Sequence, residues 1–95
     1  MSDANPKNKL VNDPKWQALR KSLVGKWKKD PVWCCNQLKK YMGLIHKTSN
    51  DHIKVVMNYL TGTGFRTGKI NHPCISALRA KLSSEIKIRK AKKQW

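Results

Sequence analysis

Three proline pairs divide this chain into helices more firmly than any other feature. Asp13-Pro14, Asp30-Pro31 and His72-Pro73 each place a polar side chain directly before a proline. That order is typical of a helix start, because the polar side chain caps free backbone N–H groups and proline is tolerated in the first turn. The second pair follows closely on the first, which predicts a short first helix between them.

Apolar residues recur every three or four positions after these starts, as they do on one face of a helix. A further stripe after Ser49 and Asn50, either of which is a candidate N-cap, predicts a third helix that Thr61-Gly62 ends, and Gly43 is expected to end the second. The four predicted stripes are Trp16, Leu19, Leu23 and Trp27; Cys34, Cys35, Leu38, Tyr41, Met42 and Ile45; Ile53, Val56, Met57 and Leu60; and Ile75, Leu78, Leu82 and Ile86.

The segment between the third and fourth helices is expected to be a β-hairpin. Residues 64–70 read Gly-Phe-Arg-Thr-Gly-Lys-Ile, with an apolar–basic pair on each side of Thr67-Gly68. That pattern indicates a tight strand–turn–strand tip. The predicted fold is therefore mainly α, with four helices and a short hairpin between helices 3 and 4. We expect residues 1–12 to be a disordered basic arm, 13–88 a single helical nucleic-acid-binding domain and 89–95 a basic C-terminal tail.

The charge balance favours a polyanionic partner. The chain carries 21 Lys and Arg against 5 Asp and Glu, a formal net charge of +16. Self-repulsion of this size destabilises a small domain unless a polyanion opposes it, so nucleic acid is the leading candidate. No apolar run is long enough to span a bilayer, and no membrane partner is expected. Three cysteines, two of them adjacent, fit a reducing environment and predict a cytoplasmic, nucleic-acid-associated protein.

Motifs for other chemistry are incomplete. The phosphate-loop pattern fails because Thr63 stands at the first glycine position and Ile70 replaces the final hydroxyl residue. Cysteines and histidines occur without a C-x-x-C pair, which disfavours zinc. Few carboxylates are available, and no third group orients a Cys/His nucleophile. We therefore expect no cofactor, no metal and no enzyme activity.

The spacing of the central segment resembles that of winged helix-turn-helix DNA-binding domains. Leu38 stands five residues before Gly43, and Ile53 stands seven before Leu60, with Gly64-Phe65 following. The resemblance covers roughly residues 31–70, although the turn from 43 to 53 is longer than the compact turn of that family. It implies a wing at residues 65–70, and a C-terminal helix that serves as a homodimer interface.

The resemblance also implies which residues read DNA. The third helix would present Asn50, Lys54, Val55 and Asn58, because Asn pairs with adenine and an apolar side chain meets a thymine methyl. The wing would contribute Arg66 and Lys69, while the basic tail would fix the domain on phosphates. The predicted nucleic-acid-binding residues are Lys47, Asn50, Lys54, Val55, Asn58, Arg66, Lys69, Arg89, Lys90, Lys92 and Lys93.

The predicted function is that of a small duplex-DNA-binding regulator of transcription or replication. A basic subunit of a nucleoprotein assembly is one alternative. Another is an RNA-binding or ribosome-associated protein, because Tyr59-Leu60, residues 64–66 and the basic last helix resemble parts of FinO-type RNA chaperones. Trp16 and Trp27 are expected in the core, whereas Trp33 and Trp95 either stack on bases or bury against a partner.

Overall fold

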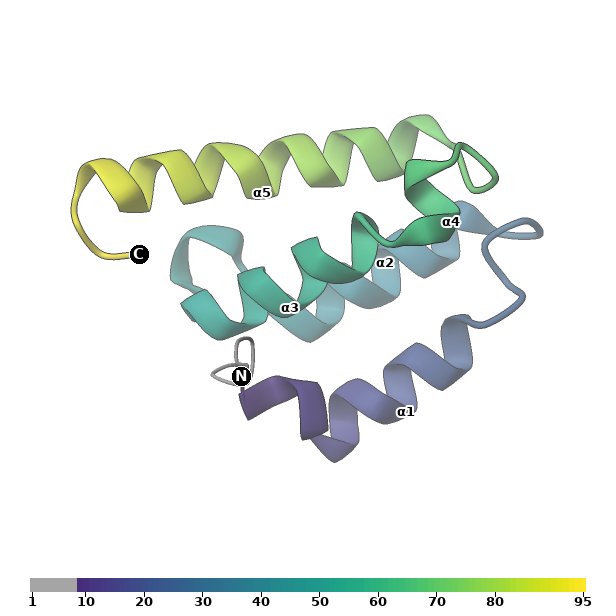
Figure 1. Ribbon diagram of the computed structural model, residues 1–95. Helices are drawn as coiled ribbons and strands as arrows, with labels where there is room; N and C mark the ends of the chain where they lie inside the picture. The colour runs from purple at the N-terminus through teal and green to yellow at the C-terminus, as the bar shows by residue number, and fades with distance from the viewer. Residues whose placement is uncertain (1–8) are drawn as a thin grey trace.

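Helices make up all the regular structure of residues 9–95, which are the residues that our computed structural model describes (Figure 1). No β-strand occurs within this range. The α-helices are α1 (Pro14–Leu23), α2 (Pro31–Met42), α3 (Asn50–Leu60), α4 (Thr63–Arg66) and α5 (Pro73–Ala91), with short 3-10 helices η2 (Lys9–Asn12) and η3 (Ile45–Lys47).

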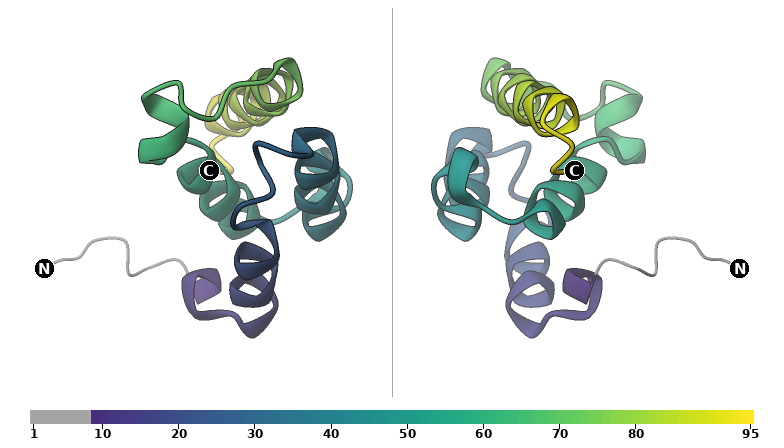
Figure 2. Two further views of the ribbon diagram at one scale, coloured as in Figure 1. Left: turned by 90° about the vertical axis from the view of Figure 1, so that its right-hand side faces the viewer. Right: turned by 90° about the vertical axis from the view of Figure 1, so that its left-hand side faces the viewer.

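The helices form three layers. α5 lies across one side of the α2/α3 pair, and α1 lies on the opposite side with η2 beside it (Figures 1 and 2). The apolar stripe of α5, formed by Ile75, Leu78 and Leu82, is buried against α2 and α3. A homodimer through α5 would therefore have to use its outer face, since the chain's own helices cover the apolar one.

The predicted helix starts are confirmed. Asp30 accepts the backbone N–H of Trp33 at 3.1 Å, and Nδ1 of His72 accepts that of Cys74 at 3.1 Å. At α1 the proline holds the first position as predicted, but Asp13 makes no side-chain cap and accepts the Tyr41 hydroxyl at 3.1 Å instead.

The predicted ends of α2 and α3 are also confirmed. α2 ends at Gly43 with φ 74°, a backbone conformation that suits glycine. α3 ends at Leu60, with Thr61 as its C-cap, and begins after the Ser49 side chain, which accepts the backbone N–H of His52. Local capping chemistry therefore sets the boundaries of these helices.

The first helix is shorter than its stripe predicted. It ends at Leu23, before the last residue of the predicted stripe, and the following Val24 is 76% exposed. Trp16 and Trp27 are core residues as expected, but Trp27 reaches the core from the turn after α1. There its indole Nε1 donates to the Tyr59 hydroxyl at 2.8 Å, which satisfies a polar group at the core boundary.

The predicted hairpin, and with it the wing, is wrong. The backbone N–H groups of Phe65 and Arg66 both donate to the carbonyl of Gly62, which makes one helical turn instead of a strand. Phe65 is turned inward, and its ring centroid lies 5.1 Å from that of Trp27. Ile70 N–H then donates to the Gly64 carbonyl and closes a tight loop. Packing of Phe65 and Ile70 against the core outweighed the local preference of this segment for a hairpin.

The described parts of the predicted arm and tail pack against the core. Residues 1–8 of the expected arm lie outside the described part, whereas Leu10 in η2 packs against the core. In the expected tail, Arg89 is buried and α5 continues to Ala91. The chain then turns back, and Trp95 packs against the core (Figure 1).

Candidate nucleic-acid interface

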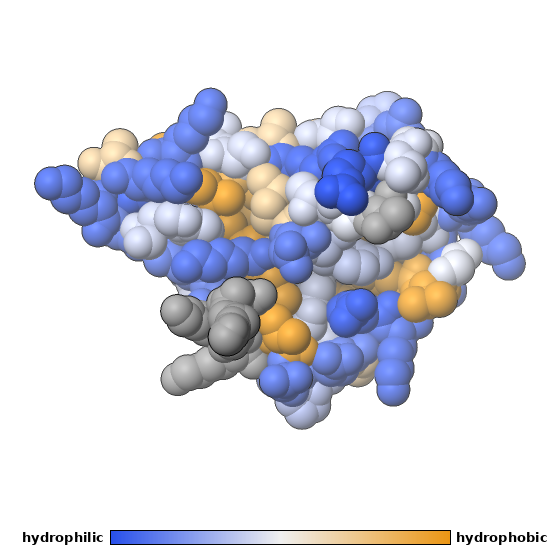
Figure 3. All heavy atoms as spheres, in the orientation of Figure 1, coloured by the Kyte–Doolittle hydropathy of each residue, from blue (hydrophilic) through white to orange (hydrophobic). Residues whose placement is uncertain are grey.

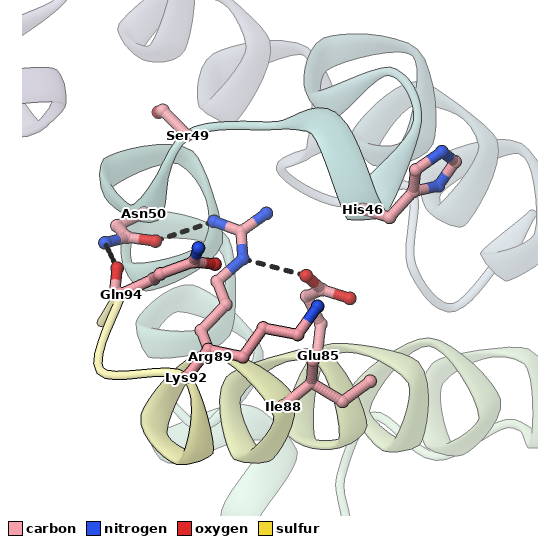
Figure 4. A pocket seen from close by; sticks show the side chains of 8 residues that line it. All are labelled: His46, Ser49, Asn50, Glu85, Ile88, Arg89, Lys92 and Gln94. Carbon is pink, nitrogen blue, oxygen red and sulfur yellow. Dashed lines mark hydrogen bonds and ion pairs between the residues drawn. The ribbon is translucent and has the colours of Figure 1, made fainter.

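The buried Arg89 guanidinium organises the C-terminal end of the molecule. Its Nε donates to Oε2 of Glu85 (2.8 Å) and its Nη1 to Oδ1 of Asn50 (2.6 Å). Its Nη2 donates to the carbonyl oxygens of Ile45 (3.0 Å) and Thr48 (2.7 Å). Figure 4 shows the guanidinium between Asn50 and Glu85. These bonds fasten α5 to η3 and to the start of α3.

Arg89 is therefore corrected from a phosphate contact to an internal anchor. Only 7% of the residue is exposed, and its charge is paired with Glu85. Two signals in the sequence could have indicated this role. Arg89 stands seven positions after the buried Leu82, so it continues the apolar stripe, and it follows Glu85 by four, the spacing of a helical ion pair.

Two of the four predicted base readers on α3 are also unavailable. Val55 is 5% exposed, so it is a core residue rather than a contact for a thymine methyl. Asn50 accepts from Arg89 and donates its Nδ2 to the Gln94 carbonyl at 2.7 Å. The expectation that Val55 points outward is wrong because α3 is covered on several sides, by α2, α5 and η2. Asn58 remains exposed.

The two tryptophans outside the inner core each carry a lysine over one ring face. The Lys54 ammonium lies 4.9 Å from the Trp95 ring centroid, and that of Lys26 lies 4.8 Å from the Trp33 centroid. Both rings are half-buried and pack against the core. Each contact is a cation–π interaction, so neither ring is an open platform for stacking a base.

Five exposed lysines gather around the Arg89 anchor. Arg89 holds η3, which carries Lys47, and Trp95 holds Lys54 at the same end of the molecule. The last turn of α5 and the residues after it add three more. We call this set the C-terminal basic cluster: Lys47, Lys54, Lys90, Lys92 and Lys93.

A hollow of about 590 Å³ opens beside the Arg89 anchor (Figure 4). Its remaining walls come from His46, Ser49, Ile88 and Lys92. The side chains of His46 and Ser49 point away from the guanidinium, so the hollow holds few groups aimed at a common point. Its shape suits a broad surface contact better than an enclosed small-molecule site.

Arg66 and Lys69 lie far from this cluster. Both are exposed, but they belong to α4 and the loop that precedes α5, whereas the cluster surrounds the other end of α5 (Figure 1). The 19 residues of α5 separate the two ends by about 28 Å at roughly 1.5 Å per residue. The predicted cations that are exposed therefore form one basic cluster and a separate basic pair, and on the face drawn in Figure 3 both hydrophilic and apolar side chains lie between the two ends.

Other kinds of site find little structural basis in the described residues. Within residues 9–95 no group of three or more His, Cys, Asp or Glu side chains is arranged to hold a metal ion. None of the described helices is long and apolar enough to cross a bilayer. The structure does bring Cys35 and Cys74 together, a proximity that their 39-residue separation in sequence gave no means of predicting.

The fold and its surface define a small, strongly basic protein that is helical throughout its described regular structure and carries five exposed lysines around the Arg89 anchor. Comparison of the chain with protein-family models, with curated proteins and with solved structures finds no match.

Proposed function

We propose that this chain binds duplex DNA by placing the C-terminal basic cluster on backbone phosphates. The observation that carries the proposal is the collection of five exposed lysines beside a carboxylate that is already neutralised. Glu85, the one acidic residue of α5, is held by Arg89 at 2.8 Å. The lysines are thus left to oppose an external polyanion, and each phosphate that they neutralise releases condensed counterions.

A duplex is a better partner than a single strand for this surface. Sequence-tolerant binding of single strands uses aromatic faces on which bases stack. The candidate rings Trp33 and Trp95 are packed against the core and have lysines over them. Contacts to phosphates need only cations on an accessible surface, which the cluster offers.

The proposed binding is largely independent of base sequence. Reading bases would require several side chains on the exposed face of α3, and Val55 and Asn50 are occupied within the protein. Asn58 alone contacts too few bases to distinguish one DNA sequence from another. The proposal therefore assigns phosphate contact to the cluster and no specific target to α3, and it places the protein beside nucleic acid in the cytoplasm.

Fluorescence anisotropy with matched probes tests this proposal. Probes of equal length would be duplex DNA of two unrelated sequences, duplex RNA and single-stranded DNA, all at one low salt concentration. We expect the two DNA duplexes to bind with affinities within a factor of about two and the single strand to bind more weakly. Tighter binding to the single strand, or to duplex RNA, would overturn the assignment to duplex DNA.

A further inference from the structure

Two thiols meet at the contact between α2 and α5. Sγ of Cys35 lies 3.1 Å from Sγ of Cys74 and donates its S–H to it. Cys35 is 1% exposed, whereas Cys74 is half-buried and reachable from solvent. A disulfide needs an S–S distance of about 2.05 Å, so closing the pair requires about 1 Å of movement between two packed helices.

An imidazole stands beside the more exposed of these thiols. Nδ1 of His72 lies 3.0 Å from Sγ of Cys74 and also accepts the backbone N–H of Cys74. Accepting that N–H uses the single in-plane lone pair of Nδ1, so this nitrogen receives the thiol proton only when it releases the backbone N–H. Cys74 is also in the first turn of the 19-residue α5, where the helix dipole favours negative charge.

The two sulfurs are therefore not equivalent. The pKa of Cys35 is raised to about 12, mainly by burial and secondly by the hydrogen bond between its thiol and Cys74. Cys35 is therefore a neutral thiol. Cys74 has the solvent access, the proton acceptor and the favourable helix end. Because the thiolate is the reactive nucleophile, Cys74 is the residue that attacks an oxidant and Cys35 is the residue that resolves the product.

We propose that Cys74 is a hydroperoxide-reactive thiol that Cys35 resolves into an intramolecular disulfide joining α2 to α5. The Cys74 thiolate, its proton passed to His72, attacks one oxygen of hydrogen peroxide; an S–O bond forms, the O–O bond breaks, and the leaving hydroxide takes the proton to become water. As Cys35 gives its proton to the departing hydroxyl group, its sulfur attacks the sulfur of Cys74 sulfenic acid; the S–S bond forms, the S–O bond breaks, and the hydroxyl group leaves as water. Two electrons pass from the thiol pair to the peroxide, which yields two waters.

A small hydroperoxide fits this site better than a bulky disulfide reagent does. Cys74 is only partly exposed; its sulfur accepts the S–H of Cys35, faces Nδ1 of His72, and donates its own S–H to the carbonyl of Pro31 at 3.6 Å. Cys34 provides an internal comparison, because it is fully buried on the same helix and burial raises its pKa as well. Within residues 9–95 Cys34 forms neither a disulfide nor a hydrogen bond to another sulfur.

Mass spectrometry of the full chain after treatment with hydrogen peroxide tests the proposal. We expect the intact mass to fall by two hydrogens, a non-reducing digest to yield one peptide pair linked through Cys35 and Cys74, and dithiothreitol to restore the thiols. This readout uses the unaltered protein and does not depend on any variant folding. Linkage through Cys34, linkage between two chains or no loss of hydrogen would overturn the proposal.

Three variants separate the roles of the residues. Cys35→Ala should stop at a Cys74 sulfenic acid that a cyclic dione labels, whereas Cys34→Ala should form the disulfide as the unaltered chain does. His72→Asn keeps an N-capping side chain but removes the imidazole, and should slow oxidation by roughly tenfold or more. Absence of the dione adduct in Cys35→Ala, or an unchanged rate in His72→Asn, would contradict the corresponding step.

Discussion

Nη1 of Arg89 lies 2.6 Å from Oδ1 of Asn50, and this contact joins the last turns of α5 to the first turn of α3. Both residues resemble free nucleic-acid contacts when only the sequence is considered. In the structure the two side chains are hydrogen-bonded to each other, so neither is free to contact nucleic acid. The exposed lysines near them therefore sit on a rigid base, which limits the conformational entropy that they lose when they bind a phosphate backbone.

Removing this anchor should destabilise the fold strongly. Arg89→Ala leaves the carboxylate of Glu85 unpaired in a nearly buried site, together with two carbonyl groups that lose their donors. We expect the free energy of unfolding, measured by urea denaturation, to fall by about 3 kcal/mol or more. Lys90→Ala, at the exposed neighbouring position, should change it by no more than about 0.5 kcal/mol. Equal effects of the two substitutions would show that Arg89 is not an anchor.

Val55 should behave as a core residue and not as a reader of DNA. Val55→Thr keeps the shape of the side chain but places a hydroxyl where only 5% of the residue is exposed. We expect a loss of about 1–2 kcal/mol in unfolding free energy and no change in affinity for DNA while the protein stays folded. Asn58→Thr puts the same side chain on the exposed face of α3 and should be nearly neutral for stability. A specific loss of DNA affinity in folded Val55→Thr would contradict this assignment.

Tyr41 should make the protein lose stability in strong alkali. The pKa of Tyr41 is raised from its usual value of 10.0 to about 12, mainly by burial and secondly by the hydrogen bond to Asp13. The fold thus favours the neutral phenol, so this contribution to stability is fully present below about pH 10. It declines as pH rises from about 10 toward 12, because the unfolded chain ionises first.

Near-ultraviolet absorbance and unfolding experiments across that pH range test the Tyr41 prediction. Tyr41→Phe should remove one high-pH step from the absorbance titration of the folded protein. It should also reduce the difference in unfolding free energy between pH 10 and pH 12, since lysine ionisation affects both proteins alike. An identical pH dependence in the two proteins would refute the role of the Asp13–Tyr41 contact.

Helix boundaries could be predicted from the sequence because their causes are local. A polar residue before proline at 30–31 and 72–73, and a glycine at position 43, act within a few residues of themselves. The segment at 63–70 could not be predicted in the same way. There Phe65 packs against Trp27, which comes from a distant part of the chain, as well as against Tyr59, so tertiary packing overrides the local pattern.

The candidate site could be predicted only in part for the same reason. Exposure of Lys90, Lys92 and Lys93 agrees with the charge pattern of the C-terminal end. The burial of Arg89 and Val55 depends on which neighbours cover each face of α5 and α3. Charge and periodicity identify candidate residues, but they do not show which cations are already satisfied within the fold.

The salt dependence of binding to duplex DNA tests the central claim most directly. Two variants with equal charge loss would be compared with the unaltered chain, one in the cluster (Lys90, Lys92 and Lys93→Gln) and one at exposed positions in α1 and the turn that follows it (Lys15, Lys21 and Lys28→Gln). If the cluster holds phosphates, its variant should reduce the slope of log K against log salt by about 2.7, roughly 0.9 for each contact. The matched variant should change the slope much less. Equal slopes for the two variants, or no binding by the unaltered chain at low salt, would contradict the account.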